Sequence, residues 1–289
     1  MKAEAGELLA DRPETRVALL ADTEGLGVTN ARVSRDAPSP PLHVHDLHAD
    51  CFLVLGGSVR LQLDGEERLV EPQSWIQVPR GVVHTFGAGS EGPATFVNLH
   101  APSCGLGTYM RGLMGAKSDE DRQRAWDGFD ARPMPEGGGR DAAAAVVCRL
   151  GDEGETITDR PGRRVTLLGD TEEIGVTESV YGPSERGPDL HVHREHTDAW
   201  IVLEGALTFV LRDGVPFEAG AGTLVVVPPN IAHGFSNEGD VNARFVNVHA
   251  PSCGFGEYLR GNNPGFDQHE PPPDGGLDPG SVVVRSFGV

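Results

Sequence analysis

Ten of the eleven histidines in this chain lie at matching positions in two similar stretches of sequence. In the first stretch His43 and His45 are separated by one residue, Asp50 follows them, and His84 lies just after a Pro/Gly turn. Because alternate side chains of a β-strand share a face, the two imidazoles of the His-x-His pair point into the same space. Divalent transition metals bind imidazole nitrogens and carboxylate oxygens in proteins. These four residues therefore predict a metal site.

The second stretch repeats the same set of residues. In chain order its members are His191, His193, Asp198 and His233. A single histidine on a strand is most often a core or surface residue, but these positions agree while many of their neighbours differ between the copies. This agreement favours metal binding, and we predict a divalent transition metal, up to one per copy. The mixed nitrogen and oxygen donors suit Fe, Mn, Ni, Co or Zn and do not choose among them.

Two further pairs of matched histidines accompany the predicted ligands. His48 and His196 lie in the turn between the His-x-His pair and the acid, where a solvent-facing or supporting role is the first expectation and direct ligation the alternative. His100 and His249 end the strands TFVNLH and RFVNVH. If that face looks into a barrel, both would line the pocket as catalytic acid/base or substrate-orienting groups. Structural hydrogen bonding is the alternative for the second pair.

The elements that position these residues are themselves duplicated. Three pairs of segments align, namely 6–29 with 154–177, 42–57 with 190–205, and 95–112 with 244–261. Each copy continues through a linker to a closing strand of pattern VVxR. We therefore predict two domains, residues 1–151 with a barrel over about 14–112, and residues 152–289 with a barrel over about 162–261 and a C-terminal arm.

Short apolar segments separated by turn residues dominate each copy. RVALL, CFLVL, VRLQL, SWIQV and TFVNLH are rich in Val, Leu, Phe and Trp, as expected of strands. This pattern predicts an all-β fold, either a compact barrel or a double-sheet jelly roll. In the first linker, SDEDRQRAWDGFD predicts a short helix with Ser118 as its N-cap. The proline-rich counterpart after residue 261 predicts coil.

The arrangement of these residues resembles a known family. A His-x-His pair, four residues, an acid, six residues and a glycine occur over 43–57 and again over 191–205, and Pro79 to His84 reads PxGxxH. These patterns resemble the two signature motifs of the cupin superfamily, and two copies resemble a bicupin with germin-like or quercetinase-like domains. The resemblance implies two tandem double-stranded β-helix (jelly-roll) barrels, in each of which the four matched ligands hold one divalent metal.

Three positions depart from the family pattern. The acid is Asp in both copies where the family usually has Glu, and its shorter arm leaves open whether it ligates directly, through water or not at all. Gln73 stands where copy two keeps Gly222, and copy two reads PPN where copy one reads PRG. Asn230 can take the positive-φ conformation of a glycine, so these last changes concern turns rather than ligands.

Composition narrows the possible partners. The formal charge of −19 would repel nucleic acid and anionic membranes, and no Lys/Arg cluster offsets it. No run of apolar residues is long enough to span a membrane, and the start of the sequence lacks the apolar core of a signal peptide. We therefore expect a cytoplasmic protein, monomeric or homodimeric, that acts on a small molecule.

Three functions fit this reading. The resemblance first implies a quercetinase-like dioxygenase of an aromatic or enolisable small molecule. Open coordination positions beside three imidazoles and a carboxylate would let the metal bind substrate and O₂ together. The first alternative is a non-redox isomerase, lyase or decarboxylase of a small hydroxy- or keto-acid, with the metal as Lewis acid. The second alternative is a non-catalytic cupin that binds a small molecule or a metal. Coupling of O₂ consumption to turnover separates the dioxygenase from the other two.

Overall fold

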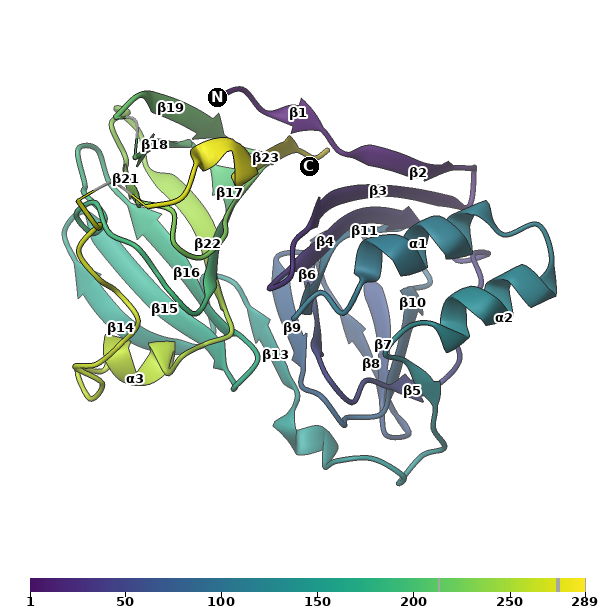
Figure 1. The fold of residues 1–289 in the computed structure, drawn as a ribbon. Helices are drawn as coiled ribbons and strands as arrows, with labels where there is room; N and C mark the ends of the chain where they lie inside the picture. The colour runs from purple at the N-terminus through teal and green to yellow at the C-terminus, as the bar shows by residue number, and fades with distance from the viewer. Residues whose placement is uncertain (213, 274–275, 289) are drawn as a thin grey trace. The chain divides into compact units, whose positions relative to one another are not determined.

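The fold is described by a computed structural model that covers residues 1–212, 214–273 and 276–288. Asp274 and Gly275, which belong to the coil predicted after residue 261, lie outside the described residues. The chain forms two compact units. The first unit comprises Gly6–Asp152, and the second comprises Met1–Ala5 together with Glu153–Gly288. Strands dominate both units, which confirms the all-β prediction (Figure 1).

Two sheets build the first unit. The seven-stranded sheet has the order β13-β9-β6-β11-β4-β3-β2, and the five-stranded sheet has the order β12-β5-β10-β7-β8. The strands of the first sheet are β2 (Glu7–Asp11), β3 (Thr15–Asp22), β4 (Gly27–Val33), β6 (Ala49–Gly56), β9 (Ser74–Val78), β11 (Ala94–Ala101) and β13 (Val146–Arg149). Those of the second are β5 (His43–Val44), β7 (Val59–Leu63), β8 (Glu66–Val70), β10 (His84–Ala88) and β12 (Arg132–Pro133).

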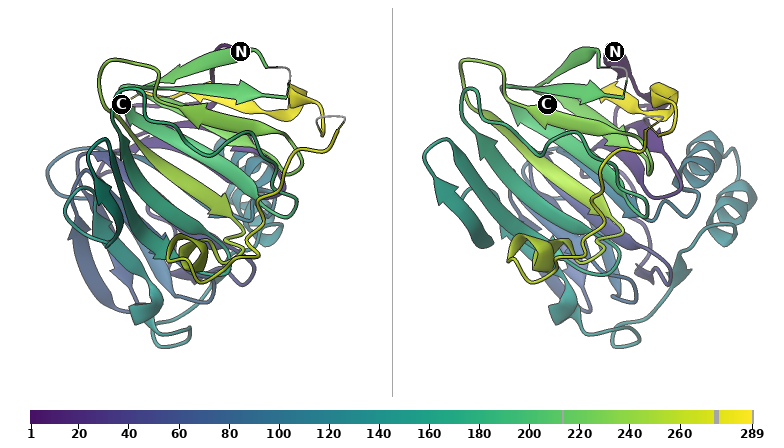
Figure 2. Two further views of the ribbon diagram at one scale, coloured as in Figure 1. Left: turned by 90° about the vertical axis from the view of Figure 1, so that its left-hand side faces the viewer. Right: turned by 60° about the vertical axis from the view of Figure 1, so that its left-hand side comes forward.

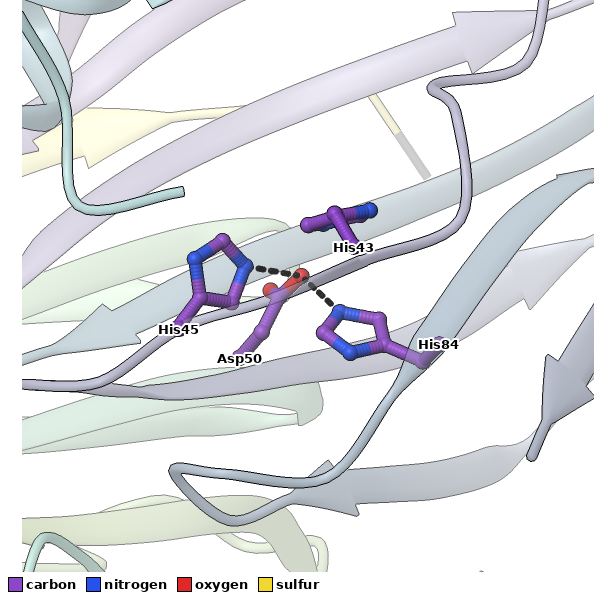
Figure 3. A group of neighbouring side chains, drawn as sticks. All are labelled: His43, His45, Asp50 and His84. Atoms are coloured by element: carbon purple, nitrogen blue, oxygen red, sulfur yellow. Dashed lines mark hydrogen bonds and ion pairs between the residues drawn. The ribbon is translucent and has the colours of Figure 1, made fainter. Parts of the chain in front are cut away.

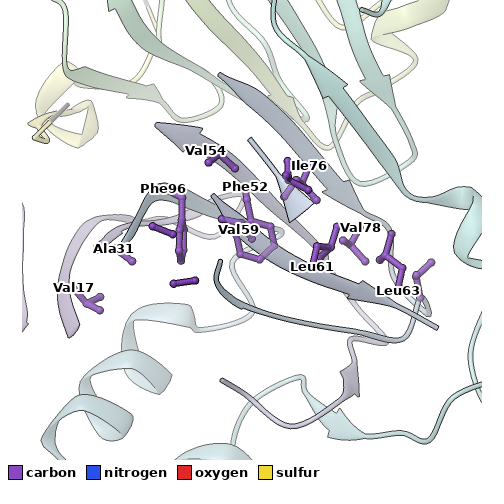
Figure 4. Close-up of a cluster of buried hydrophobic side chains, with 14 of the residues drawn as sticks. Val17, Ala31, Phe52, Val54, Val59, Leu61, Leu63, Ile76, Val78 and Phe96 are labelled. Carbon is purple, nitrogen blue, oxygen red and sulfur yellow. The ribbon is translucent and has the colours of Figure 1, made fainter. Parts of the chain in front are cut away.

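The hydrophobic core of the first unit follows from the two-residue period of its strands. In β7 the apolar residues Val59, Leu61 and Leu63 are buried, and the polar residues between them are partly exposed. Phe52 of β6 and Phe96 of β11 pack in the same cluster (Figure 4). Each such side chain contributes about 1.5–3 kcal/mol when it leaves water. The inward faces of β6 and β11 therefore point into the unit, and the residues two positions along share that direction.

The second unit repeats this plan with an eight-stranded and a three-stranded sheet, of orders β1-β23-β20-β17-β22-β16-β15-β14 and β19-β18-β21. Figure 2 shows the strands of the larger sheet side by side and twisted. The large sheet contains β1 (Glu4–Ala5), β14 (Glu155–Arg160), β15 (Arg163–Asp170), β16 (Gly175–Tyr181), β17 (Thr197–Glu204), β20 (Thr223–Val227), β22 (Ala243–Ala250) and β23 (Val283–Ser286). The small one contains β18 (Ala206–Leu211), β19 (Pro216–Gly220) and β21 (His233–Ser236).

The chain's first residues pair with its last strand. β1 lies parallel to β23, with Glu4 opposite Arg285 and Ala5 opposite Ser286. The predicted boundary near residue 151 puts residues 1–5 in the first domain, whereas this pairing places them beside the second unit. The edge of β23 offers backbone groups to a passing strand, a contact that no local sequence pattern encodes.

Three α-helices accompany the strands in the described residues. In the first linker, α2 (Asp119–Asp127) begins as predicted, because the Ser118 hydroxyl accepts a hydrogen bond from the Asp121 amide. The sequence analysis missed α1 (Leu106–Gly115) and α3 (Phe255–Leu259), whose N-cap glycines have no capping side chain. No helix in the described part of the chain is both long and apolar enough to cross a membrane.

The turns around the predicted ligand positions keep their shape despite the sequence differences. Gln73 has φ of 61° where its counterpart Gly222 has 77°. Asn230 has φ of 66° where its counterpart Gly81 has 82°. The prediction that Asn230 takes the glycine conformation is confirmed. At both departures from the family pattern the backbone therefore takes the same left-handed conformation in the two units.

Candidate metal centres

Four buried side chains from the two sheets of the first unit meet at one place. His43 on β5 and His84 on β10 are paired partners in the smaller sheet. Asp50 lies on β6 of the larger sheet, two residues before Phe52 and on the same inward face. His45 follows β5 directly. One potential ligand atom from each of these four lies within 4.8 Å of those of the others, and the side chains point toward one another (Figure 3).

Backbone carbonyls hold the three imidazoles in one tautomer. In His43, His45 and His84 alike, Nδ1 contacts a main-chain oxygen. The three oxygens belong to Pro41, Asp130 and Val82, at 2.8, 2.5 and 3.0 Å respectively. Because a carbonyl can only accept a hydrogen bond, each Nδ1 carries the proton and each Nε2 presents a lone pair. Three lone pairs are thus available in the cluster.

The carboxylate of Asp50 is shared between the cluster and strand β11. Its Oδ2 lies 3.2 Å from Nε2 of His84 and 3.8 Å from Nε2 of His45. Its Oδ1 accepts a hydrogen bond of 2.5 Å from the Asn98 amide and lies 3.3 Å from Nε2 of His100. Oδ2 therefore faces the imidazoles, while Oδ1 is held by Asn98 and His100 on the other side. The aspartate side chain, although shorter than that of glutamate, reaches the cluster.

The second unit has the same cluster. His191 and His233 pair across an isolated bridge, and Oδ2 of Asp198 lies 3.5 Å from Nε2 of both His193 and His233. Asn247 donates to Asp198 Oδ1 at 2.5 Å, as Asn98 does in the first unit. The Nδ1 atoms of the three histidines again contact main-chain oxygens, those of Asp189, Ile231 and Asp267. The two centres thus share both their donors and the groups that orient them.

A known family matches both halves of the chain. The Cupin domain family matches residues 32–100 and 177–249, which contain all eight clustered residues. The chain belongs to the cupin superfamily. It is a bicupin with one domain match in each unit, so the recognition of the motifs and the predicted jelly-roll architecture are confirmed.

Two kinds of relatives accompany this family match. The bicupin is 23% identical over 227 residues to quercetin 2,3-dioxygenase of Bacillus subtilis (strain 168), an alignment that covers 68% of this chain. The chain spans only 65% of the length of that relative. Among solved structures it resembles oxalate decarboxylase, with a TM-score of 0.59 and 18% identity over 86% of this chain and 78% of the other. A Bacillus subtilis oxalate decarboxylase structure at pH 4.6 gives a TM-score of 0.54, again at 18% identity, over 86% of this chain and 77% of that one. At this identity the structural likeness shows the fold.

The electrostatics of both centres suit a divalent cation. Burial, together with the neighbouring imidazoles, lowers the pKa of His43 to about 2 and that of His191 to about 3. Burial alone would raise the pKa of Asp50 and Asp198, but the surrounding histidines, led by His100 and His249, hold it well below its usual value. His193 differs, because its contacts with the carboxylates of Asp198 and Asp267 outweigh burial and raise its pKa. A neutral His43 or His191 beside an ionised aspartate has the protonation state that metal binding requires.

Unsatisfied atoms point to the same conclusion. Nε2 of His45 and Nε2 of His233 are buried and have no hydrogen-bond partner. Buried polar atoms in proteins are nearly always satisfied, so each such atom calls for an explanation. A cation coordinated at each cluster satisfies both. The predicted cofactor class, a divalent transition metal, therefore fits the donors present in each unit of the bicupin.

The remaining matched histidines lie behind the aspartates. Nε2 of His100 is 3.1 Å from the Asn98 side-chain oxygen, and Nε2 of His249 has the same distance to that of Asn247. His48 and His196 are fully buried, so the solvent-facing reading of these two is wrong. The turn that carries each one folds inward, because its ring finds an acidic partner in the linker.

That acidic partner is the residue which the sequence analysis missed. Nδ1 of His48 lies 2.8 Å from Asp130, and Nδ1 of His196 lies 2.9 Å from Asp267. A signal was present, since FDAR and FDQH place a Phe-Asp pair at the same point of both linkers. The signal had no evident meaning in the sequence, because the linkers otherwise differ in length and composition.

Cys104 and Cys253 occupy matched turns near the same linker residues. Both have positive φ, 48° and 50°, and neither forms a disulfide. Burial and the charge of Asp130 raise the pKa of the Cys104 thiol, and burial with nearby acids raises that of Cys253 to about 11. A thiol with a raised pKa is a poor nucleophile at neutral pH, so these side chains are suited to packing.

Proposed function

We propose that this bicupin is a metal-dependent dioxygenase that acts on an aromatic or enolisable small molecule. The supporting observation is an aromatic group beside the histidines of the first centre. Trp126 stands edge-on to His43 with 5.6 Å between ring centroids, and Tyr109 stacks on Phe129 at 4.3 Å. Trp126 and Tyr109 are only half-buried, so their surfaces remain accessible to a planar ligand.

The protein groups supply charge and orientation to this chemistry. A divalent metal held by three neutral imidazoles and one carboxylate supplies a Lewis acid with open coordination positions. The single carboxylate leaves the centre with a net positive charge, which favours an anionic oxygen of an enolised substrate. His43, His45, His84 and Asp50 would hold the metal in the first unit, and their counterparts His191, His193, His233 and Asp198 in the second.

His100 and His249 have a supporting part in this proposal. His100 contacts Asp50 Oδ1, the oxygen turned away from the imidazoles, and His249 lies 3.7 Å from the equivalent oxygen of Asp198. Each therefore acts on the centre through its aspartate, orienting the carboxylate. An acid/base role would require substrate to approach from the same side as these rings.

The similarity to quercetin 2,3-dioxygenase supports the proposal, and that enzyme suggests the first substrate to test. The full chain is depleted of metal and reloaded separately with Fe(II), Mn(II), Co(II) and Ni(II), and O₂ uptake is followed with quercetin. We expect O₂ uptake equimolar with loss of quercetin, absent in the His84→Ala/His233→Ala double variant. Loaded protein that binds a panel of flavonols and enolisable diketones without any O₂ uptake would refute the dioxygenase.

The second candidate is a non-redox decarboxylase or lyase of a small acid. It is favoured by the likeness in fold to oxalate decarboxylase, which extends over 86% of this chain. In that case oxalate takes up a proton and splits into formate and CO₂, or a small keto-acid splits into a carbonyl compound and CO₂, without net O₂ consumption. Ligand binding that survives complete metal removal would favour the third possibility, a non-catalytic binding protein.

A further inference from the structure

The linker of the first unit contributes a residue to its centre through four contacts. The main-chain oxygen of Asp130 accepts the hydrogen bond of His45 Nδ1 at 2.5 Å. The Asp130 carboxylate accepts from the amides of Asp46 and Leu47, at 3.2 and 2.8 Å, and contacts His48 Nδ1 at 2.8 Å. Asp130 therefore contacts each residue of the bend 45–48, which leads from the His-x-His pair toward Asp50.

Asp267 makes the same contacts in the second unit. Its main-chain oxygen is bonded to His193 Nδ1, and its carboxylate accepts from the amide of Arg194 at 2.9 Å and from that of Glu195 at 2.7 Å. Nδ1 of His196 lies 2.9 Å from the same carboxylate. The backbone hydrogen bonds and the close approach of the histidine to the carboxylate thus recur in the second unit.

The residue before each of these aspartates fixes the linker against the buried histidines. Phe129 lies 5.3 Å from the ring of His48, and Phe266 lies 5.3 Å from that of His196. On its other side Phe266 stacks on Tyr258 at 4.5 Å, as Phe129 stacks on Tyr109. The Phe-Asp pair is therefore anchored by packing as well as by hydrogen bonds.

The residues after each aspartate extend the sheet at the metal cluster. In the first unit Arg132 of β12 pairs with Val44, the residue between the two ligand histidines. In the second unit the backbones of His269 and Val192 exchange hydrogen bonds of 2.9 and 3.0 Å. The two linkers differ in length, and the described residues of the second contain no counterpart of the helix α2. Both nevertheless reach the same register beside the His-x-His strand.

Building on the proposed metal sites, we infer that Asp130 and Asp267 are positioning residues. Through them each linker orients the second histidine of the His-x-His pair toward the metal. The carboxylate bonds to the bend and so fixes the linker aspartate in place. The main-chain carbonyl of the same aspartate then keeps Nδ1 of the second histidine protonated and its Nε2 turned to the cation. Removing the carboxylate leaves two backbone amides and a buried imidazole without their acceptor. The second histidine is then no longer confined to one orientation, and metal affinity falls.

The test is a titration of the full metal-free chain with Mn(II) in a background carrying His233→Ala, so that only the first centre remains. We expect Asp130→Ala to weaken Mn(II) binding about 10–100-fold, the loss typical of groups that orient metal ligands. Asp130→Asn keeps the size and one acceptor oxygen, and should restore part of the affinity. The matched control is Asp127→Ala, because Asp127 lies in the same linker, is exposed, and bonds to the Gln123 side chain. Unchanged affinity in both Asp130 variants would overturn the inference.

A second measurement separates this inference from the proposed metal sites. In the metal-free chain, ¹⁵N NMR of the imidazoles reports which ring nitrogen of His45 carries the proton, with the signal assigned by its absence in His45→Gln. We expect an Nδ1-protonated ring in the parent and a mixture of tautomers in Asp130→Ala. A parent chain that takes up neither Mn(II) nor Fe(II) would refute the metal sites, and the tautomer comparison would still decide the role of Asp130. An unchanged tautomer in Asp130→Ala would refute the role.

Discussion

The two centres of this chain agree in their innermost atoms and differ at their edges. Both have three histidines, an aspartate, an asparagine that holds the aspartate and a linker aspartate that holds the bend. Around this shared set, His196 Nε2 contacts His249 Nδ1 at 2.9 Å, whereas the rings of His48 and His100 stack at 4.6 Å. Trp126 faces His43 from α2, and the second linker has no such helix in its described residues. The two units thus have the same metal-binding side chains, while the residues around those side chains differ. These differences allow the two units to have different functions.

Removing one ligand from each unit has the largest expected effect and tests whether the centres are independent. His84→Ala and His233→Ala should each lower the bound metal by one equivalent per chain, and the double variant should bind none. Activity of the unit that works should fall more than the ten- to hundredfold typical of groups that only orient ligands. Metal content measured by mass spectrometry beside turnover checks both statements. Loss of both metals from a single variant would show that the centres are coupled.

The next largest effect is expected from changing Asp50 and Asp198, which tests whether the carboxylate oxygen that faces the histidines contributes to metal binding. In Asp50→Asn and Asp198→Asn the amide keeps the shape but removes the negative charge that faces the imidazoles. We expect metal affinity to fall about 10–100-fold in the altered unit. Calorimetric titration with Mn(II) measures the change. Equal affinity in parent and variant would mean that the three histidines bind the metal unaided.

Acid should destabilise the metal-free chain through its buried histidines. The pKa of an unfolded histidine is near 6.5, whereas burial lowers the pKa of His43 to about 2 and that of His191 to about 3. The unfolded state therefore binds more protons over that window, and stability falls as the pH drops below 6.5. Each such residue contributes about 1.4 kcal/mol per pH unit. Urea unfolding at pH 7, 6, 5 and 4 measures the slope, which should be shallower in His43→Gln.

Trp126 stands beside the first centre, so its removal should have a smaller effect, confined to substrate binding in the first unit. Trp126→Ala should raise KM for an aromatic substrate about three- to tenfold, since an aromatic contact is worth about 0.5–1.5 kcal/mol. Metal content should stay unchanged. Gln123→Ala, on the exposed face of the same helix, is the matched control and should leave KM as it is. A reduced metal content in Trp126→Ala would mean that the ring supports the centre rather than the substrate.

The last comparison concerns the stability of the fold at the two matched turns. Gln73→Gly removes a Cβ that the left-handed backbone strains, but it also removes the interactions of the glutamine side chain, so the free energy of unfolding should change by less than about 1 kcal/mol. Gly222→Ala adds such a Cβ and should destabilise the fold by about 1–2 kcal/mol. Urea denaturation of the full chain measures both. A larger loss of stability in Gln73→Gly would mean that the interactions of the glutamine outweigh the backbone strain.

Much of the fold and of the candidate centres could be predicted from local patterns. The alternation in VRLQL, the Ser118 cap and the His-x-His spacing each depend on residues within a few positions of one another. The helix α1 escaped prediction, since its N-cap residue is a glycine and its first turn has no acid. The burial of His48 and His196 escaped too, because a turn histidine looks solvent-exposed until its partner is known.

The sequence by itself determined the duplication and the donor set, because the repeat and the two-residue period of a strand are written in neighbouring residues. Only the tertiary structure decided which oxygen of Asp50 faces the histidines, and that Asp130 lies against His45 and His48. Those contacts join residues that are far apart in the chain. Strand pairing and the path of the linker create them, and no local pattern records either.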